Sequence, residues 1–142
     1  DLIPTGEIRD VTGTPMDFRT LKTIGQDIEK DYLPLKQGKG YDHNYVLKTS
    51  KDEVSLVAEL MEETTGRKME VFTDLPGMQV YTGNHLHEIE NCKDGATYGP
   101  YNGVCFETQF FPDSCNKKEF KSCVFRAGEE YDYTTIYRFT NI

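Results

Sequence analysis

The sequence has no Trp and only three His among its 142 residues. Nine Tyr and eight Phe must therefore provide most of the large packing surface. With so few His, a catalytic triad or a histidine-rich metal site has few candidates. Basic residues are also scarce, because 16 Lys and Arg stand against 24 Asp and Glu, a net charge of -8. This balance argues against nucleic acid and anionic membranes as partners, since both attract clustered cations.

Long apolar runs and signal sequences are missing as well. No stretch approaches the roughly 20 apolar residues of a membrane helix, and the N-terminal segment has no basic and apolar signal regions. The first residue is Asp rather than Met, so we expect the chain to begin inside a longer protein. The four Cys form no CxxC pair, which argues against a zinc ribbon. We favour free thiols in a cytoplasmic protein, with two disulfides in a secreted protein as the alternative.

Strand patterns dominate from residue 44 onward. Apolar residues alternate with others over 54–60, and Tyr131, Tyr133, Thr135, Tyr137 and Phe139 share one face of the last segment. Such alternation predicts an all-β fold of half-buried antiparallel sheets, a sandwich or barrel. Six short segments bounded by turns are expected to be strands: 44–49, 54–60, 68–73, 78–81, 104–109 and 131–139.

One short helix is expected before the strands, over residues 20–32. Leu21, Ile24 and Ile28 repeat there at helical spacing, and Pro34 follows as a stop signal. The glycine-rich segment 36–41 matches neither a P-loop nor a dinucleotide fingerprint. We expect it to be a plain flexible connection.

Glu107 is the one charged residue in the segment 104–111. On a strand, its side chain shares a face with Cys105 and Gln109. Burial there would raise the pKa of the carboxyl group and suit a general base near neutral pH. The alternative is a solvent-facing glutamate on a one-sided sheet, and the pattern alone favours that alternative.

Asp42 and Gln79 are further polar candidates. Asp42 begins the triplet Asp-His-Asn, which can hold sugar hydroxyls or simply bond to the backbone of a turn. Gln79 lies between two turns, where an amide can bind a hydroxyl or face solvent. His85 and His87 have the alternate spacing of a strand face, but no metal motif surrounds them. We therefore expect exposed loop histidines and no metal site.

Several segments, taken in order, resemble the aldose 1-epimerase (galactose mutarotase) family. They cover nearly the whole chain, so residues 1–142 would be the C-terminal part of a single domain whose N-terminal part is absent from this chain. The resemblance implies a large antiparallel β-sandwich, the galactose mutarotase-like supersandwich. The matching segments include Ile3–Ile8, Gly13–Arg19, Gly40–Asn44, Thr65–Arg67, Pro76–Asn84, Cys105–Gln109, Phe111–Asp113 and Gly128–Tyr131.

The resemblance also implies an activity. Family members are isomerases that interconvert the α and β anomers of free hexoses such as galactose and glucose, without a metal or cofactor. The matched positions imply Glu107 as the general base at the C1 hydroxyl and Asp42 and Gln79 as sugar-binding residues. The family's acid histidine belongs to an N-terminal stretch that these residues do not contain. We therefore expect the chain to need that N-terminal half as a partner and to be weak or inactive alone.

Two alternatives stay open. The chain can be a truncated relative that binds sugar without turnover, or a hexose-6-phosphate 1-epimerase on the same fold. The second needs a basic cluster for the phosphate, and none stands out in the sequence.

Overall fold

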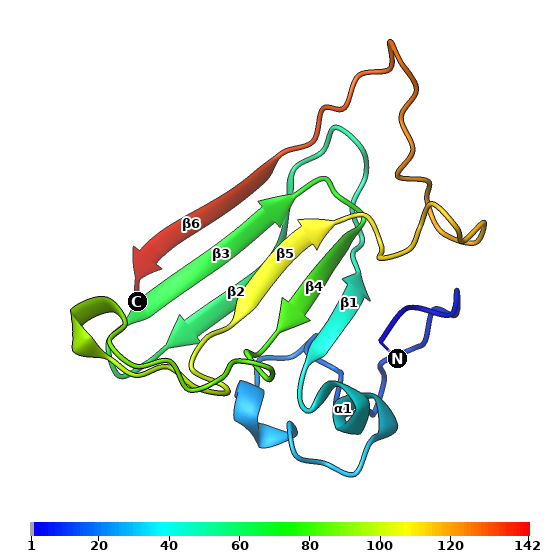
Figure 1. Cartoon of the computed structure of the whole chain (residues 1–142). Helices are drawn as coiled ribbons and strands as arrows, with labels where there is room; N and C mark the ends of the chain where they lie inside the picture. Colours follow the sequence, from blue (N-terminus) through cyan, green and yellow to red (C-terminus); the bar gives the residue numbers. More distant parts are fainter. Residues whose placement is uncertain (1) are drawn as a thin grey trace. The chain divides into compact units, whose positions relative to one another are not determined.

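A computed structural model describes residues 2–142, which form six strands and little helix (Figure 1). The strands make two three-stranded sheets, with the orders β1-β4-β5 and β2-β3-β6. Every expected strand segment is confirmed, although the ends shift, and so is the all-β antiparallel class. The strands are β1 (Asp42–Val46), β2 (Ser55–Glu62), β3 (Arg67–Thr73), β4 (Gly77–Tyr81), β5 (Cys105–Gln109) and β6 (Thr135–Asn141).

The chain divides into two compact units, each of which is described by itself. Unit 1 contains the chain up to His43 together with Gln79–Cys105. Unit 2 contains Asn44–Met78 together with Phe106–Ile142. Asp42 and Gln79 therefore belong to unit 1, and Glu107 belongs to unit 2.

The helix expected over residues 20–32 is wrong. That segment holds only a 3-10 turn, η1 (Ile24–Gln26), and Leu21 is 68% exposed rather than packed. The α-helix α1 (Leu33–Gly38) begins where the predicted helix ends. Pro34 stands in its first turn, where a fixed φ is favourable and no N–H is needed. The proline that the pattern treats as a stop signal therefore starts the helix. No helix in residues 2–142 is long and apolar enough to span a membrane.

The glycine-rich segment after α1 is a helix cap rather than a plain connection. Lys39 has a left-handed backbone with a φ of 54°. The Gly40 N–H donates to the Leu35 carbonyl at 2.9 Å, which closes the end of the helix. A Cβ at Gly40 would lie 2.6 Å from Asn84 Oδ1, so only glycine fits this close approach.

Asn84 joins the end of α1 to the strands of unit 1. Its buried amide donates to the carbonyl oxygens of Gly38, at 2.9 Å, and Tyr41, at 2.8 Å. Its Oδ1 accepts a hydrogen bond from the Thr82 hydroxyl at 2.5 Å. Tyr41 is fully buried. This network therefore fixes the backbone directly before Asp42.

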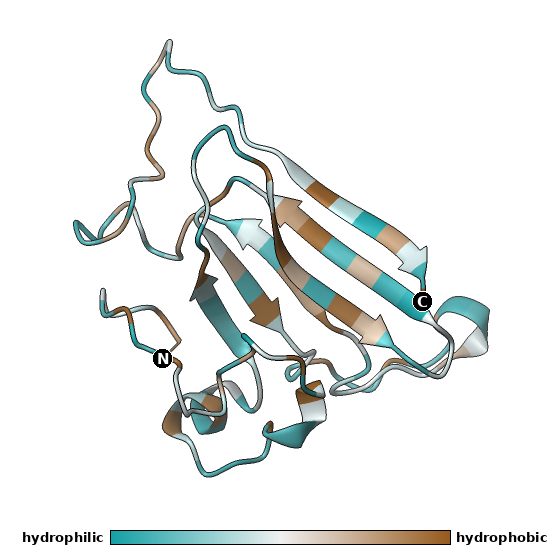
Figure 2. Ribbon diagram, turned by 180° about the vertical axis from the view of Figure 1, so that it is seen from behind, coloured by the Kyte–Doolittle hydropathy of each residue, from teal (hydrophilic) through white to brown (hydrophobic). Residues whose placement is uncertain are grey.

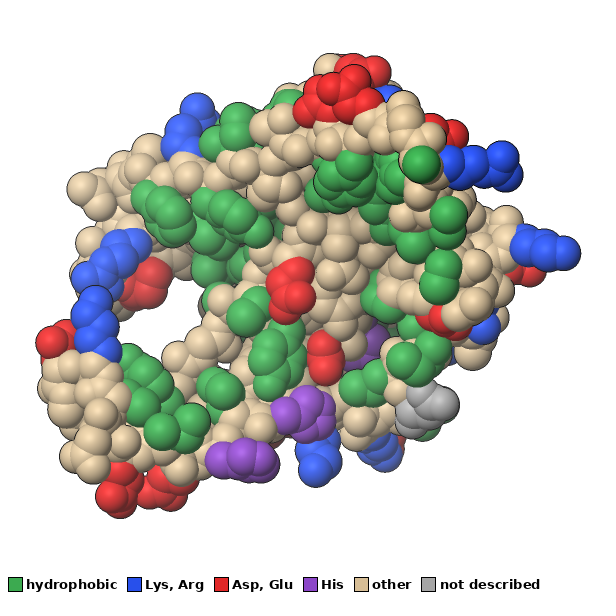
Figure 3. Space-filling model, turned by 45° about the horizontal axis from the view of Figure 1, so that its top comes forward, with side chains coloured by type: hydrophobic (Ala, Val, Ile, Leu, Met, Phe, Trp, Pro, Cys, Tyr) green, Lys and Arg blue, Asp and Glu red, His purple; other side chains and the backbone are tan. Residues whose placement is uncertain are grey.

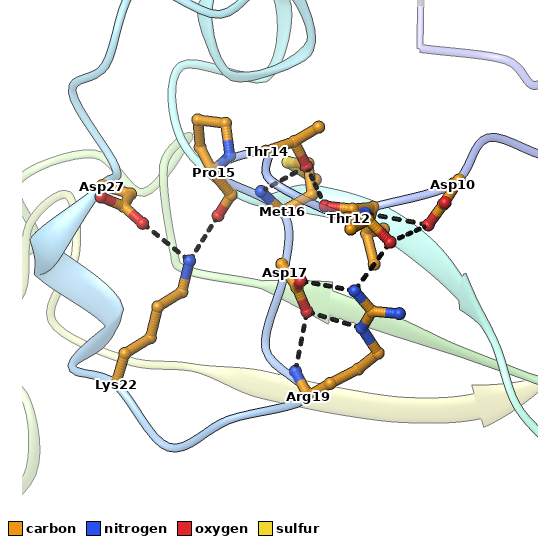
Figure 4. A network of polar contacts seen from close by, with 10 residues as sticks. Asp10, Thr12, Thr14, Pro15, Met16, Asp17, Arg19, Lys22 and Asp27 are labelled. Atoms are coloured by element: carbon orange, nitrogen blue, oxygen red, sulfur yellow. Dashed lines mark hydrogen bonds and ion pairs between the residues drawn. The ribbon is translucent and has the colours of Figure 1, made fainter.

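Lys22 holds two parts of the N-terminal segment together within unit 1 (Figure 4). Its ammonium group donates to the Pro15 carbonyl at 2.8 Å and to the Asp27 carboxylate at 2.7 Å. Asp27 is buried, and its bonds to Lys22 and Lys30 hold the pKa of its carboxyl group below the usual range. The Pro15 carbonyl also accepts the Tyr41 hydroxyl at 3.0 Å. The N-terminal segment thereby supports the same buried tyrosine as Asn84 does.

The antiparallel sheet β2-β3-β6 belongs to unit 2, and β3 is its central strand. Val71 of β3 pairs with Ala58 in β2 and with Tyr137 in β6. Val71 is fully buried, whereas every residue of β6 after Thr135 is exposed. Figure 2 shows apolar and polar residues interspersed along these strands.

A β-bulge in β2 interrupts the alternation expected over 54–60. Leu56 pairs with Phe72, but Ala58 pairs with Val71, so Val57 is an extra residue in the ladder. Residues before and after a bulge of this kind face opposite sides of the sheet. Leu56 is accordingly 47% exposed, while Ala58 is half-buried. The single apolar face predicted for this strand is therefore wrong.

The last strand starts later than predicted because its first aromatic residues pack elsewhere. Tyr131 and Tyr133 precede β6 and form a cluster with Phe110 and Phe125, with ring centroids between 4.9 and 6.5 Å apart. The Lys121 ammonium lies 5.5 Å from the Tyr133 ring centroid. Ring packing and this cation–π contact, not strand alternation, place the two tyrosines.

Glu62 organises the turn between β2 and β3. Its carboxylate accepts hydrogen bonds from the backbone N–H groups of Thr64 and Thr65, each at 2.8 Å, and from the Thr65 hydroxyl. These hydrogen bonds lower the pKa of Glu62 to about 2, and the bond from the Thr65 side chain has the largest effect. Gly66 follows with a φ of 69°, a conformation that favours glycine. The Glu62 carboxylate thus accepts the two N–H groups of the turn in place of backbone carbonyls.

Replacing Asn84 by Ala should lower the free energy of unfolding by about 1 to 3 kcal/mol, because the Gly38 carbonyl loses its side-chain donor and the Tyr41 carbonyl keeps only Thr82. Chemical denaturation of the natural protein measures this loss. Asn141→Ala, at the exposed end of β6, is the matched control and should change stability by less than about 0.5 kcal/mol. Equal stability of the two variants would contradict the role of Asn84.

Replacing Glu62 by Gln should destabilise the protein only while the carboxyl group is ionised. Because folding lowers its pKa, the carboxylate stabilises the turn above the ordinary glutamate value of 4.5, and this effect disappears as pH falls to about 2. Denaturation at a series of pH values compares wild type with Glu62→Gln. The exposed neighbour Glu63, replaced by Gln, is the control. A difference that persists at the lowest pH would rule out this explanation.

Candidate functional site

Asp42 and Gln79 lie in direct contact in unit 1. Gln79 Nε2 donates a hydrogen bond to Asp42 Oδ1 at 2.7 Å. Their strands, β1 and β4, are neighbours in the sheet, which explains how residues 37 positions apart in the chain meet. Both side chains are half-buried. Two of the three residues singled out from the sequence are therefore brought together.

His43 supports the backbone of Asp42. Its Nδ1 accepts a hydrogen bond from the Asp42 N–H at 3.0 Å, so this nitrogen carries no proton. Burial lowers the pKa of His43, and the Asp42 charge and the Pro34 carbonyl only partly oppose this effect. Gly38 lies against the ring, since a Cβ there would stand 3.3 Å from Cε1. A neutral His43 thus positions the strand rather than supplying a charge.

His85 is a neighbour of Asp42 that the sequence alone does not identify. Its Nε2 lies 4.0 Å from Asp42 Oδ2. Its ring stacks on Tyr81, with centroids 6.3 Å apart and 15° between the planes. The side chain is 46% exposed, which confirms the prediction of an exposed histidine but places it beside a candidate residue. The signal that points to it is Gly83, whose φ of 70° turns the chain back after β4.

The other histidine and the cysteines add no second site within residues 2–142. His87 is exposed, as predicted. The structure joins none of the four cysteines in a disulfide, so the free thiols favoured from the sequence stay a prediction. Among the described residues, no group of three or more His, Cys, Asp or Glu side chains is placed to hold a metal ion.

Glu107 lies on β5 in unit 2, and its side chain is exposed. The residues on either side of it anchor the strand. The Phe106 carbonyl accepts a hydrogen bond from the Tyr137 hydroxyl at 2.5 Å, and the hydroxyls of Thr108 and Thr135 share a hydrogen bond of 2.5 Å. Within the described chain the carboxylate is not buried, so any burial must come from outside these residues.

A pocket of about 190 Å³ in unit 1 is lined by three lysines, Lys30, Lys36 and Lys39. Two of them already hold ion pairs, because Lys30 lies 2.8 Å from Asp27 and Lys36 lies 2.5 Å from Asp31. Because these carboxylates partly neutralise the lysine charges, the pocket gives little support to a phosphate site.

The chain matches proteins of one family over almost its entire length. The family model described as aldose 1-epimerase matches residues 1–138. The chain is 41% identical over 139 residues to galactose mutarotase from Homo sapiens and 33% identical over 139 residues to aldose 1-epimerase from Escherichia coli (strain K12). These matches cover 98% and 96% of this chain, but 39% and 40% of the relatives. The chain thus spans about two fifths of the length of these relatives.

Solved structures agree with this assignment. A GalM/aldose epimerase homologue from C. elegans is similar with a TM-score of 0.78 and 26% identity, over 99% of this chain and 41% of that one. Galactose 1-epimerase from Lactobacillus acidophilus NCFM is similar with a TM-score of 0.75 and 26% identity, over 98% of this chain and 39% of that one. Both likenesses confirm the antiparallel β-sandwich that the resemblance implied. The chain belongs to the aldose 1-epimerase family.

Proposed function

We propose that this chain carries the general base and sugar-binding residues of an aldose 1-epimerase, which interconverts the α and β anomers of free hexoses such as galactose and glucose. The observation that carries the proposal is the 2.7 Å hydrogen bond between Gln79 and Asp42, in a chain of this family. Two of the relatives described above are named for galactose and for aldoses, which supports the substrate class.

Asp42 and Gln79 are the proposed sugar-binding residues. A carboxylate and an amide together offer the acceptors and donors that sugar hydroxyls require. Gln79 Nε2 bonds to Asp42 Oδ1, so Oδ2 is the oxygen proposed to accept a sugar hydroxyl. The second N–H of the Gln79 amide is the proposed donor to the sugar. His43 keeps the backbone of Asp42 in place.

Glu107 is the proposed base, and its exposed carboxylate is open to a ligand. Its task is to take the proton of the C1 hydroxyl while another proton reaches the ring oxygen. The bond between C1 and the ring oxygen then breaks, and the open sugar rotates about C1–C2. Closure by the reverse proton transfers gives the other anomer. The reaction leaves the composition of the sugar unchanged, so it consumes no second reactant.

The proton for the ring oxygen is proposed to come from a histidine outside these 142 residues, in an N-terminal half of the same domain. His43 is unsuited to the task because its Nδ1 holds the backbone and burial lowers its pKa. The chain spans about two fifths of its relatives, which leaves room for that half. Large apolar side chains lie at the surface (Figure 3), and on unit 2 they include Leu56, Ile136, Tyr137 and Phe139. By the register of the sheet, Leu56 and Ile136 lie on one face and Tyr137 and Phe139 on the other. Exposed apolar side chains on both faces suit a covering polypeptide, and without it the chain is expected to be inactive.

A sugar-binding protein without turnover is the second candidate, because the chain holds the Asp42–Gln79 pair but not the family's acid histidine. Binding of galactose without acceleration of its mutarotation identifies this alternative. We also propose a cytoplasmic location, where thiols stay reduced, and the lack of a disulfide among the four cysteines agrees with it.

Replacing Glu107 by Gln should slow mutarotation by about 100- to 10,000-fold, because an amide cannot accept the proton. Polarimetry of freshly dissolved α-D-galactose with the natural protein measures this rate. Glu119→Gln, an exposed glutamate in the same unit, is the control and should keep the wild-type rate. Full activity of Glu107→Gln would exclude it as the base. A wild-type protein no faster than buffer would exclude the enzyme.

Replacing Gln79 by Met should raise the KM for galactose by about 3- to 10-fold with little change in kcat, because one sugar-binding amide is lost. Initial rates by polarimetry across a range of galactose concentrations give both constants. Gln37→Met, on the exposed side of α1, is the matched control. An unchanged KM for Gln79→Met argues against a binding role.

A further inference from the structure

The gap between His85 and Asp42 has the size of one hydroxyl group. His85 Nε2 and Asp42 Oδ2 are 4.0 Å apart, which is too far for a direct hydrogen bond. A single oxygen at about 2.8 Å from both atoms fits between them, with roughly a right angle between its two hydrogen bonds. Gln79 does not compete for this place, since it bonds to the other carboxylate oxygen, Oδ1.

The charges around the gap suit a hydroxyl group. A carboxylate facing Nε2 favours the imidazole tautomer that carries its proton on that nitrogen. His85 Nε2 is then a donor, and Asp42 Oδ2 is an acceptor. A hydroxyl is the group that satisfies both, because it accepts with its lone pairs and donates its own proton.

His85 is held in place before any ligand arrives. Its ring stacks on Tyr81, and its backbone N–H donates to the Tyr81 hydroxyl at 3.0 Å. The turn that carries it is closed by a hydrogen bond of 3.1 Å from the Leu86 N–H to the Gly83 carbonyl. Asn84, directly before His85, is buried and fully bonded to unit 1. An ordered imidazole loses little freedom on binding, which favours affinity.

We propose that His85 and Asp42 bind one hydroxyl of the hexose together, so that His85 is a further positioning residue of this site. The inference rests on the proposed function and deepens it, because it adds a residue beyond Asp42, Gln79 and Glu107. The side chain of His85 is 46% exposed, so a sugar can reach it. Recognition of that hydroxyl is then shared between a carboxylate oxygen that accepts and an imidazole N–H that donates.

The first test separates the nitrogens of His85 from its ring. His85→Phe keeps an aromatic ring on Tyr81 but removes both nitrogens, and in the natural protein it should raise the KM for galactose by about 3- to 10-fold with kcat nearly unchanged. His87→Phe makes the same change at an exposed position two residues away and should leave both constants unchanged. His85→Gln, which keeps an N–H donor, should recover part of the loss. A KM for His85→Phe equal to that of wild type overturns the proposal.

The second test identifies the hydroxyl. One monodeoxygalactose should have a raised KM with the wild-type protein, and with His85→Phe this penalty should shrink by about 3- to 10-fold, while the other deoxy sugars keep theirs. Equal penalties for every deoxy sugar in the two proteins overturn the proposal.

A third measurement separates the inference from the proposed enzyme. If the wild-type protein does not accelerate mutarotation, the proposed enzyme fails, and calorimetry with galactose then tests His85 by itself. Weaker binding by His85→Phe than by wild type upholds the shared hydroxyl. Equal binding by the two proteins, or no binding by wild type, overturns it.

Discussion

The buried amide of Asn84 is the interaction on which the candidate site depends. It bonds to two backbone carbonyls, of Gly38 and Tyr41, and the second also accepts the Thr82 N–H at 3.1 Å. The first carbonyl ends α1, and the second directly precedes Asp42. Because a buried carbonyl without a donor is costly, the backbone has few other ways to run here. A glycine at position 40 is part of the same solution, since any side chain would collide with this amide.

The same constraint sets the chemistry of unit 1. The backbone of Asp42 is fixed, one of its carboxylate oxygens accepts a hydrogen bond from Gln79, and the other lies near His85. His43 stays neutral because it is buried and uses Nδ1 as an acceptor, so it adds no positive charge against the carboxylate. The result is an acceptor with defined neighbours rather than a flexible acidic side chain. Such an arrangement suits selective binding of an uncharged polyol, and it offers few favourable contacts to a phosphate group.

Unit 2 has a different character. Its strand β5 holds Glu107 on a backbone that Tyr137 and Thr135 anchor, and the carboxylate points to solvent. Its sheet leaves Phe139 74% exposed. Exposed apolar side chains in the unit that holds the candidate base agree with the proposal that a further part of the domain completes the surroundings of the base. The relatives are about two and a half times as long as this chain. In the proposed enzyme, the general base therefore lies in this chain and the general acid lies outside it.

The sequence by itself determined the six strands and the all-β class, because side-chain alternation along a strand depends only on its local geometry. It did not show the bulge at Val57 or the start of α1 at Pro34, since pairing register and helix capping depend on distant partners. The roles expected for Asp42, Gln79 and Glu107 came from family resemblance, not from spacing. Only the tertiary structure decided that Gln79 contacts Asp42 and that His85 stands beside them. Strand pairing and the turn at Gly83 bring these side chains together, and no local pattern records such a meeting.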